Sequence, residues 1–433
     1  MTRTLDRPVP PYALHHHPTL DALTVRPVIL IEGPRTVAEW DDTPLEEWDN
    51  PLLEWDMDLV PGYLDATCDY QAVETAAGPP DDRGIFPASQ ATIQLANPTG
   101  TWSRFNTDGS PTAYGPGTKL IVLAHYNTPG TDWYVFRGTV TGWSDLGDHV
   151  EIEAHDAFAD LAQPIGTYTP GVNGDTTVTR LNAIVAAAGR TGIPVAFAAG
   201  DVVLTAQATT QSPVDEMRTV SASDGGELFT DADGTVVYYR RTWRAGRTDQ
   251  TLFPVISDNV CTADIRAWDT VLSTSDATVA DTVILENVAK LHSQSPAGAI
   301  GRFILTATGL QYTTLTEGDT LASFMWTNQQ TARVEVAEFD LYLHDPNQPD
   351  LYRAVEWRLF DKARFIHDYT AADGVARLDV NMLVSGIGHQ ITPDGWIMSV
   401  ATGKANSFNQ NNVWNPPGDP YVWDTVNTVW GYQ

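Results

Sequence analysis

Four short stretches decide the fold class of this chain: Ala91-Thr-Ile-Gln-Leu, Lys119-Leu-Ile-Val-Leu-Ala, Trp133-Tyr-Val-Phe-Arg-Gly-Thr-Val-Thr-Gly-Trp and Val150-Glu-Ile-Glu-Ala. Apolar and polar residues alternate in the first and the last stretch, as is typical of strands with one buried face. Turn signals separate the stretches, such as Asn97-Pro-Thr-Gly after the first of them. Short strands divided by Gly and Pro turns indicate a small antiparallel barrel or sandwich.

Helical patterns follow the last of these strands. Asp156 is positioned to cap a short helix that ends at Leu161, and an Ala-rich helix is predicted over residues 179–188, before Gly189. A third helix begins at Ser212-Pro213, because Ser is a favoured N-cap and Pro is favoured in the first turn. The turn Asp231-Ala-Asp-Gly between two apolar runs then predicts a hairpin. This middle region is therefore α+β.

Strand patterns return after residue 260. They lie at residues 333–343, 380–387 and 396–401, and a helix is predicted over residues 319–333.

Both ends of the chain carry an acidic repeat with Trp in it. Between residues 39 and 56, each Trp is followed by Asp and Pro-Leu recurs between them, and no Lys or Arg occurs from 36 to 82. Residues 413–430 are similar in composition. Spaced aromatic residues with turn formers between them suit small hairpins or a loop laid on another surface. The Trp residues are candidate anchors for a partner: Trp40, Trp48, Trp55, Trp414, Trp423 and Trp430.

The charge of the chain excludes several classes of partner. The 433 residues include 25 Lys and Arg against 55 Asp and Glu, which gives a formal net charge of -30. Such a chain does not grip a phosphate backbone, which requires cations to displace counterions, and anionic membrane surfaces repel it for the same reason. With 42% hydrophobic residues it has enough apolar side chains to build a core.

Cysteine content and targeting signals add further limits. Cys68 and Cys261 are too few and too far apart for a disulfide framework, and we expect both to be reduced core residues. The N-terminus lacks the apolar run of a secretion signal, and no stretch is long and apolar enough to span a bilayer. We therefore expect synthesis in the cytoplasm and no membrane insertion.

No catalytic or cofactor motif is present in the sequence. There is no nucleophile elbow, phosphate-binding loop, dinucleotide fingerprint or zinc-protease motif. A calcium loop starting at Asp231 would need Gly where Val236 stands and Glu where Thr242 stands, so the hairpin is favoured. The histidines lack ligand spacing, and we predict no metal, no cofactor and no enzymatic activity. A glycosidase carboxylate pair among the many acids stays open as an alternative.

Several segments together resemble the tail hub, or minor tail protein, family of tailed bacteriophages. They are Asp65-Ala-Thr-Cys-Asp-Tyr, Phe86-Pro-Ala-Ser-Gln-Ala-Thr-Ile-Gln-Leu-Ala-Asn-Pro-Thr-Gly-Thr-Trp-Ser, Pro116-Gly-Thr-Lys, Phe136-Arg-Gly-Thr-Val-Thr-Gly-Trp, Val150-Glu-Ile-Glu-Ala-His-Asp-Ala-Phe-Ala-Asp-Leu-Ala, Asp224-Gly-Gly-Glu-Leu-Phe-Thr-Asp-Ala-Asp-Gly and Val384-Ser-Gly-Ile-Gly-His-Gln-Ile-Thr-Pro-Asp-Gly-Trp. Each is a turn between strands, and their order and spacing carry the resemblance.

The resemblance implies a structural virion protein akin to a baseplate hub. Such hubs are homotrimers in which two β-barrel domains per chain form a pseudo-six-fold ring that continues the tail tube. The implied partners are the distal tail protein, the C-terminal end of the tape-measure protein and other tip proteins. The family has no catalytic residues to carry over, and the implied location is the tail tip of the virion.

Residues and resemblance together predict an α+β, mainly β chain. It would contain two small antiparallel β-barrel domains with an inserted α+β domain, flanked by Trp-rich terminal segments. The predicted parts are an arm with the first strand and the acidic repeat at 1–58, a first barrel at 59–165, the α+β domain at 166–258, a second barrel with a helix at 259–405, and a C-terminal tail at 406–433.

Two functional readings follow from this division. In the first, the chain is the hub, and carboxylates lining the channel would repel DNA so that it passes without binding. In the alternative, the chain is a tail-tip protein that binds a host receptor or a glycan through the Trp-rich repeats, since aromatic faces suit sugar rings. A hydrophobic anchor to a protein partner is the plainer reading of those repeats.

Overall fold

The computed structural model describes residues 25–32, 63–78, 86–112, 114–126, 131–190, 192–198, 202–205, 208–241, 253–257, 268–274, 282–285, 304–307, 309–328, 334–344, 351–371 and 374–404. The described chain is mainly β, which confirms the coarser part of the predicted fold class. The Trp-rich segments at both ends lie outside the described residues.

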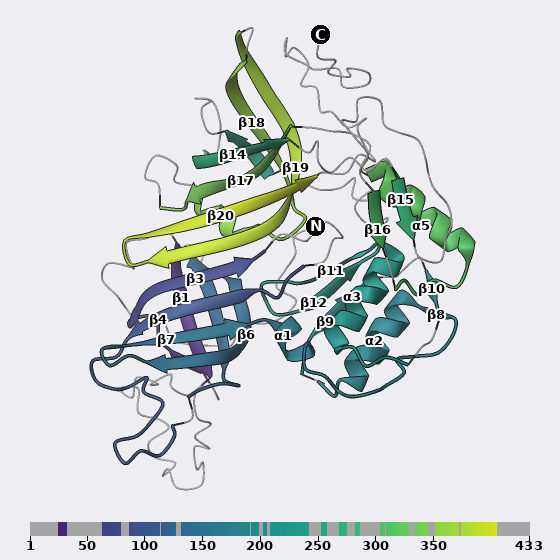
Figure 1. The fold of residues 1–433 in the computed structure, drawn as a ribbon. Helices are drawn as coiled ribbons and strands as arrows, with labels where there is room; N and C mark the ends of the chain where they lie inside the picture. Colours follow the sequence, from purple (N-terminus) through teal and green to yellow (C-terminus); the bar gives the residue numbers. More distant parts are fainter. Residues whose placement is uncertain are drawn as a thin grey trace, which may run out of the picture.

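Thirteen strands form one sheet, shown on the left of Figure 1. Its central path runs β14-β17-β20-β19-β3-β4-β7-β6-β5-β1-β2, and β18 and β13 branch from β19. The strands from the first part of the chain are β1 (Val25–Glu32), β2 (Tyr63–Asp65), β3 (Tyr70–Ala77), β4 (Gln90–Ala96), β5 (Lys119–Tyr126), β6 (Thr131–Asp145) and β7 (His149–His155). Those from the last part are β13 (Phe253–Ser257), β14 (Trp268–Thr274), β17 (Val334–Tyr342), β18 (Lys362–Ala371), β19 (Gly374–Thr392) and β20 (Gly395–Lys404).

The sheet contains the same strand order twice. The N-terminal half runs β3-β4-β7-β6-β5-β1, and the C-terminal half runs β14-β17-β20-β19-β18-β13. Each half has a long strand whose hairpin partner pairs with it across a register shift, between Val140 and Gly142 in β6 and between Val384 and Gly386 in β19. The halves differ in their last pair, since β1–β5 is antiparallel and β13–β18 is parallel.

The two halves join edge to edge through β19 and β3. These strands pair antiparallel from Ile387 opposite Ala77 to Ile391 opposite Val73. Among the described strands the sheet follows an open path and does not close into a barrel, so the two closed barrels stay a prediction. The predicted domain boundaries stay a prediction as well.

One face of the central strands is buried and the other is polar. On the buried face, Val73 lies opposite Ile93, which lies opposite Ile152, and all three belong to the main hydrophobic core. On the polar face, Glu74 lies opposite Thr92, which lies opposite Glu153. The alternation in the sequence predicted this division, because side chains of successive strand residues point to opposite faces.

The α+β unit lies beside the sheet (Figure 1). Asp156 caps α1 (Ala157–Leu161) as predicted, and Ser212 caps α3 (Pro213–Asp224), which ends at Gly225 with φ +67°. The predicted hairpin around Asp231 is confirmed. The remaining elements are β8 (Asp175–Thr176), α2 (Thr177–Ala187), β9 (Val195–Phe197), β10 (Val203–Leu204), β11 (Glu227–Thr230) and β12 (Val236–Tyr239).

Two features differ from the sequence expectations. Helix α5 (Leu315–Asn328) begins before residue 319, because Thr314 and Glu317 form a capping box: the Glu317 amide donates to Thr314 Oγ1, and the Thr314 amide donates to Glu317 Oε2. Cys68 is exposed rather than part of the core, since it lies in the turn between β2 and β3.

Strands β15 (Thr282–Leu285) and β16 (Ile304–Ala307) form a separate parallel pair that α5 contacts.

Candidate functional site

The Trp residues predicted as anchors all lie outside the described residues, and the structure does not test them. The described part of the chain instead brings residues together where the N-terminal half, the α+β unit and the C-terminal half of the sheet meet. We call this place the three-part junction; its central side chains are Phe86, Phe229, Arg218, Arg358 and Phe360.

An aromatic trio forms the apolar centre of the three-part junction. Phe86 precedes β4, Phe229 lies in β11, and Phe360 precedes β18, so each comes from a different part. The ring of Phe360 lies 5.5 Å from that of Phe86 and 5.2 Å from that of Phe229, both at steep angles, and Phe86 lies 5.7 Å from Phe229. Such edge-to-face contacts add to the burial of the rings. All three are buried, so these contacts fix the parts against one another.

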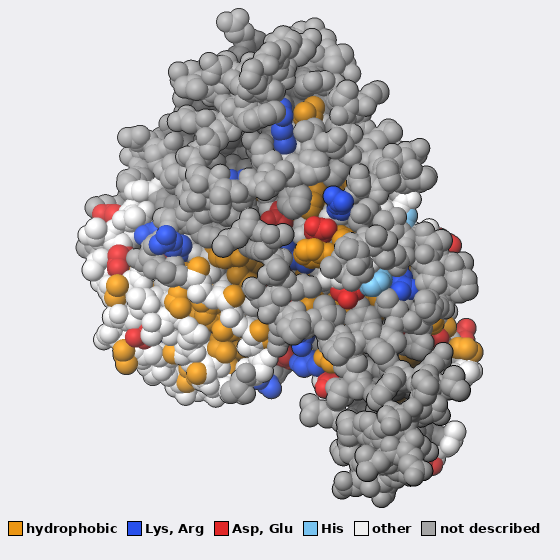
Figure 2. Space-filling model, turned by 180° about the vertical axis from the view of Figure 1, so that it is seen from behind, with side chains coloured by type: hydrophobic (Ala, Val, Ile, Leu, Met, Phe, Trp, Pro, Cys, Tyr) orange, Lys and Arg blue, Asp and Glu red, His pale blue; other side chains and the backbone are white. Residues whose placement is uncertain are grey.

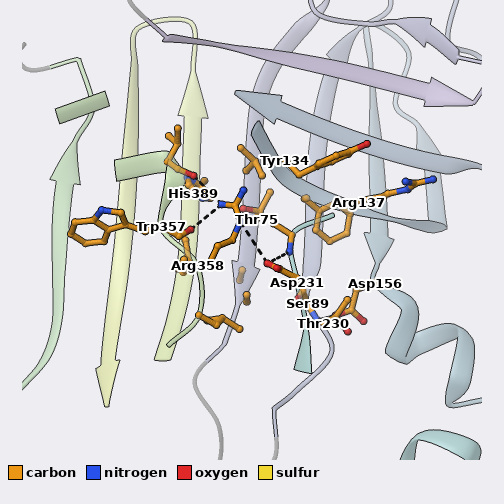
Figure 3. Close-up of a pocket in the computed structure, with 18 residues that line it drawn as sticks. Thr75, Ser89, Tyr134, Arg137, Asp156, Thr230, Asp231, Trp357, Arg358 and His389 are labelled. Carbon is orange, nitrogen blue, oxygen red and sulfur yellow. Dashed lines mark hydrogen bonds and ion pairs between the residues drawn. The ribbon is translucent and has the colours of Figure 1, made fainter. Parts of the chain in front are cut away.

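Arg358 links the C-terminal half to both other parts. It follows the 3₁₀ helix η3 (Leu351–Glu356), and its Nη1 donates to the carbonyls of Val355 and Trp357 at 3.1 and 2.9 Å. Its Nε lies 3.7 Å from Asp231 Oδ1 in the hairpin of the α+β unit (Figure 3). Its guanidinium lies 5.7 Å from the centre of the Trp133 ring in β6. One side chain thus contacts three segments far apart in sequence.

Arg218 supports the same junction from helix α3. Its Nη2 donates to the carbonyl of Phe86 at 2.9 Å, and its guanidinium lies 5.5 Å from the centre of the Phe158 ring in α1. The planar guanidinium suits this combination of a hydrogen bond and a cation–π contact.

A cavity of about 40 Å³ lies at the three-part junction. Figure 3 shows Thr75, Ser89, Asp156, Arg358 and His389 around it. Since one water requires about 10–15 Å³ on this measure, the cavity has room for a few waters only. It does not accommodate a sugar ring or a nucleotide, so the residues around it are best explained by assembly of the fold.

His389 is a buried neutral base at the seam between the halves. It lies in β19 opposite Thr75 of β3, and its Nδ1 accepts a hydrogen bond from Trp396 Nε1 at 3.1 Å. Burial, with a smaller contribution from the nearby Arg358 charge, lowers the pKa of His389 to about 3. The imidazole therefore stays neutral at physiological pH, which its role as an acceptor requires.

Asp156 ties the first helix to the sheet at the edge of the cavity. Its Oδ1 accepts from the amide of Phe158 at 2.9 Å, and its Oδ2 accepts from the amide of Ser89 at 2.7 Å. Burial raises the pKa of Asp156, and the two backbone donors oppose that shift. A cap therefore also fixes the path of the chain before β4.

A second buried polar network holds residues 309–313 in the α+β unit. Arg180 is fully buried; its Nη1 donates to Gln311 Oε1 at 3.3 Å, and its Nε lies 3.5 Å from Asp175 Oδ2. Gln311 Nε2 donates to Glu216 Oε1 at 2.7 Å, and the Gln311 amide donates to Ser223 Oγ. Residues 309–313 are thus held by side chains of the α+β unit.

Two surfaces differ sharply in charge. The polar face of the sheet carries carboxylates, and strands β3, β4, β7 and β17 contain no Lys or Arg. Its acids are Glu74, Glu151, Glu153, Glu338 and Asp340. The α+β unit, at the lower left of Figure 2, shows apolar and uncharged side chains with few charges between them. Its exposed apolar residues include Ile165, Val172, Val195 and Val203.

No group of three or more His, Cys, Asp or Glu side chains among the described residues is arranged to hold a metal ion. None of the helices in those residues combines the length and the apolar character needed to cross a bilayer.

The residues of the three-part junction were not predicted from the sequence. Arg358 and Phe360 lie between predicted elements and carry no motif, and their partners are distant in sequence. The one available signal was that Arg358 lies in an apolar run, Trp357-Arg-Leu-Phe, where a charged residue needs a partner.

Comparison with solved structures identifies the fold. A 43 kDa tail protein of prophage MuSo2 from Shewanella oneidensis aligns with a TM-score of 0.51 and 12% identity, over 88% of this chain and 98% of that chain. A tail protein from Neisseria meningitidis aligns with a TM-score of 0.55 and 10% identity, over 87% of this chain and 96% of that one. The chain has the fold of these phage tail proteins.

A third structure is more distant. An Escherichia coli type VI secretion component, described as similar to bacteriophage T4 tail proteins, aligns with a TM-score of 0.42 and 9% identity, over 78% of this chain and 74% of that chain. At that score the alignment does not establish a shared fold. No protein-family model matches the chain, and no curated protein matches it either.

Proposed function

We propose that this chain is a structural hub protein of a phage tail tip, which assembles as a homotrimer into a ring that continues the tail tube. The observation that carries the proposal is the repeated half: two sets of strands in the same order, joined edge to edge, within a fold shared with phage tail proteins. Three copies of a duplicated chain would present six similar halves around one axis, which matches a six-fold tube.

Copy number tests the ring directly. The full chain would be purified and its mass measured by native mass spectrometry over a range of concentrations, and copies per particle would be counted in isolated tail tips. Three copies per ring are expected. Six copies of the chain per tip would contradict the hub and favour the distal tail protein in its place.

The proposed partners are the distal tail protein, the C-terminal end of the tape-measure protein and other minor tail proteins. The face of the α+β unit seen in Figure 2 has few charged side chains, which supports a protein contact, since the buried centres of protein interfaces are depleted in charged residues. The Trp-rich segments stay the proposed anchors. We place the protein in the virion tail tip after synthesis in the host cytoplasm, with no enzymatic role and no membrane insertion by this chain.

Deletion of residues 406–433 separates the two functional readings. If the tail segment anchors a neighbour in the assembly, phage carrying the deletion will fail to complete tails. Complete tails that no longer adsorb to the host would instead favour the receptor- or glycan-binding reading. A matched variant with Trp414, Trp423 and Trp430 changed to Ala keeps the length of the segment and isolates the rings.

The acidic polar face is proposed as a wall of the channel. Carboxylates there would let DNA pass without sequence-specific binding or retention, because like charges repel. A reconstruction of the tail tip is expected to show Glu74 and Glu153 facing the lumen. If those residues face outward, or if the lumen wall is neutral or basic, the channel proposal fails.

A further inference from the structure

The end of β6 and one edge of β14 have no strand partner among the described residues. Strand β5 pairs with β6 only as far as Thr139, and the loop before β5 covers Val140 through bonds with Gly117 and Thr118. Among the described strands, residues 142–145 then pair with β7 alone. Strand β14 ends the sheet path and, of the strands that the structure describes, pairs with β17 alone. Open strand edges are templates for pairing with another chain.

The repeated half shows what occupies the corresponding edge inside the chain. Strand β18 pairs with β19 as far as Leu383. The main chain of Val384 is then hydrogen-bonded to Phe360 and Asp361. The main chain of Val140 is hydrogen-bonded to Gly117 and Thr118 in the same way. Residues 387–391 then pair with β3. The register shifts at Gly142 and Gly386 align the two halves, so residue 143 corresponds to 387 and residue 145 to 389.

The partner strand also has a counterpart. Glu74 of β3 lies opposite Thr92 of β4, and Thr92 lies opposite Glu153 of β7. In the other half, Val271 of β14 lies opposite Glu338 of β17, which lies opposite Ala401 of β20. Glu153 and Ala401 each lie next to the register shift of their own half, so Val271 corresponds to Glu74. The pairing of β14 with β17 shifts between Val271 and Leu272, where β17 has one extra residue. Counted along β14 itself, residues 272–274 therefore correspond to 75–77.

We propose that copies of this chain join by antiparallel pairing of residues 143–145 of β6 in one copy with residues 272–274 of β14 in the next. The proposal rests on the proposed ring and names the surface that closes it. In this register Ser144 of one copy lies opposite Ser273 of the other, as Gly388 lies opposite Ala76 within the chain. The contact is head-to-tail, and such contacts generate rings when the rotation closes.

The arrangement of the sheet supports this contact. In Figure 1, β14 and β17 lie at one end of the stacked strands, and β7 and β6 lie at the other end. The β14 edge of one copy would therefore meet the end of β6 in the next copy. The polar face of the sheet would then continue from copy to copy. Main-chain bonds carry strand addition, so the contact does not require charge complementarity between two chains that are both acidic.

Disulfide trapping tests the register. The full chain with Cys68→Ser and Cys261→Ser would carry Ser144→Cys and Ser273→Cys, and it would be oxidised at the concentration where the ring forms. Directly opposed strand residues have Cβ atoms about 4.5–5.5 Å apart, close to what a disulfide requires. Covalent dimers and trimers on a non-reducing gel, lost on reduction, are expected.

Two matched variants control the experiment. Glu74→Cys with Gln390→Cys reproduces the junction inside the chain and should form a disulfide at monomer mass, since these residues are already opposed. Ser144→Cys with Thr270→Cys moves the second thiol about 10 Å along the strand, at roughly 3.3 Å per residue, and should not link copies.

The outcomes separate this surface from the proposed function. Trimers by native mass spectrometry without an intermolecular disulfide, while the Glu74–Gln390 control closes, would overturn the surface and leave the hub standing. Equal linking by the Thr270 pair would also overturn it. Single copies at every concentration and in isolated tips would overturn the surface together with the ring.

Discussion

The segments that precede β5 and β18, which are corresponding strands of the two halves, contact different parts of the molecule. In the N-terminal half, Gly117 and Thr118 bond Val140 before β5 begins at Lys119; in the C-terminal half, Phe360 and Asp361 bond Val384 before β18 begins at Lys362. Both leading residues have positive φ, +98° at Gly117 and +69° at Phe360. A bulky residue such as Phe is strained at positive φ. The packing of the Phe360 ring must therefore stabilise the fold by more than this strain destabilises it.

The contacts of each segment explain the difference. The loop at 97–118 packs on its own half: the ring of Tyr114 stacks on Trp143 at 5.4 Å and lies 5.7 Å from Trp102. The corresponding segment of the C-terminal half carries Arg358 and Phe360 to the α+β unit and the N-terminal half. The segment before β5 thus packs within its own half, whereas the segment before β18 connects the two halves and the α+β unit.

The largest expected effect is at Phe360. Phe360→Ala should lower the free energy of unfolding by about 3–5 kcal/mol, because a fully buried ring with two aromatic neighbours is lost. Urea denaturation of the purified chain measures it.

Phe360→Gly then isolates the backbone strain. Although it removes one more carbon, it should be about 1 kcal/mol more stable than Phe360→Ala, since Gly adopts positive φ without penalty. If Phe360→Gly is less stable than Phe360→Ala, the positive φ at residue 360 does not strain a non-glycine residue. Backbone strain then does not distinguish the two halves.

The next effect is at Arg358. Arg358→Met keeps the apolar stem but removes hydrogen bonds to two carbonyls and the pairing with Asp231, and should cost about 2–3 kcal/mol. Asp231→Asn alone should cost less, because the carbonyl contacts remain. Equal losses in the two variants would mean that Asp231, rather than the carbonyls, dominates the link.

His389, which lies where the two halves of the sheet join, makes the free energy of unfolding depend on pH. The pKa of His389 is about 3 in the folded chain and 6.5 ordinarily, so the unfolded chain binds the extra proton as pH falls below 6.5. Stability from neutral His389 is therefore present above pH 6.5 and is lost as pH falls toward 3. Between pH 7 and 5 the loss is about 2 kcal/mol.

A His389→Gln variant tests this contribution. Its unfolding free energy should fall by about 2 kcal/mol less than that of the parent between pH 7 and 5, since the carboxylates contribute equally to both. Identical pH profiles would show that the imidazole is not the responsible group. Loss of the Trp396 partner lowers stability at both pH values and does not affect this difference.

Local patterns predicted the elements, and long-range pairing decided the site. The caps at Asp156 and Ser212 and the turn at Asp231 follow from short-range chemistry, and all are present. The pairing of β3 with β19 joins strands more than 300 residues apart and leaves no mark in either strand's alternation. Phe360 was unpredictable for a similar reason, since only the comparison of the halves shows that it occupies a glycine position.

The smallest expected effect is the reciprocal change in the N-terminal half. A Cβ at Gly117 would meet no atom within 4 Å, so Gly117→Ala tests the backbone alone and should cost about 1–2 kcal/mol through its φ of +98°. Gly192→Ala is the matched control: its Cβ would also meet open space, but its φ lies outside the left-handed region. That variant should be unchanged or stabilised by up to about 1 kcal/mol through the unfolded chain. Equal effects of the two substitutions would show that the conformation at Gly117, and by correspondence at Phe360, is not strained.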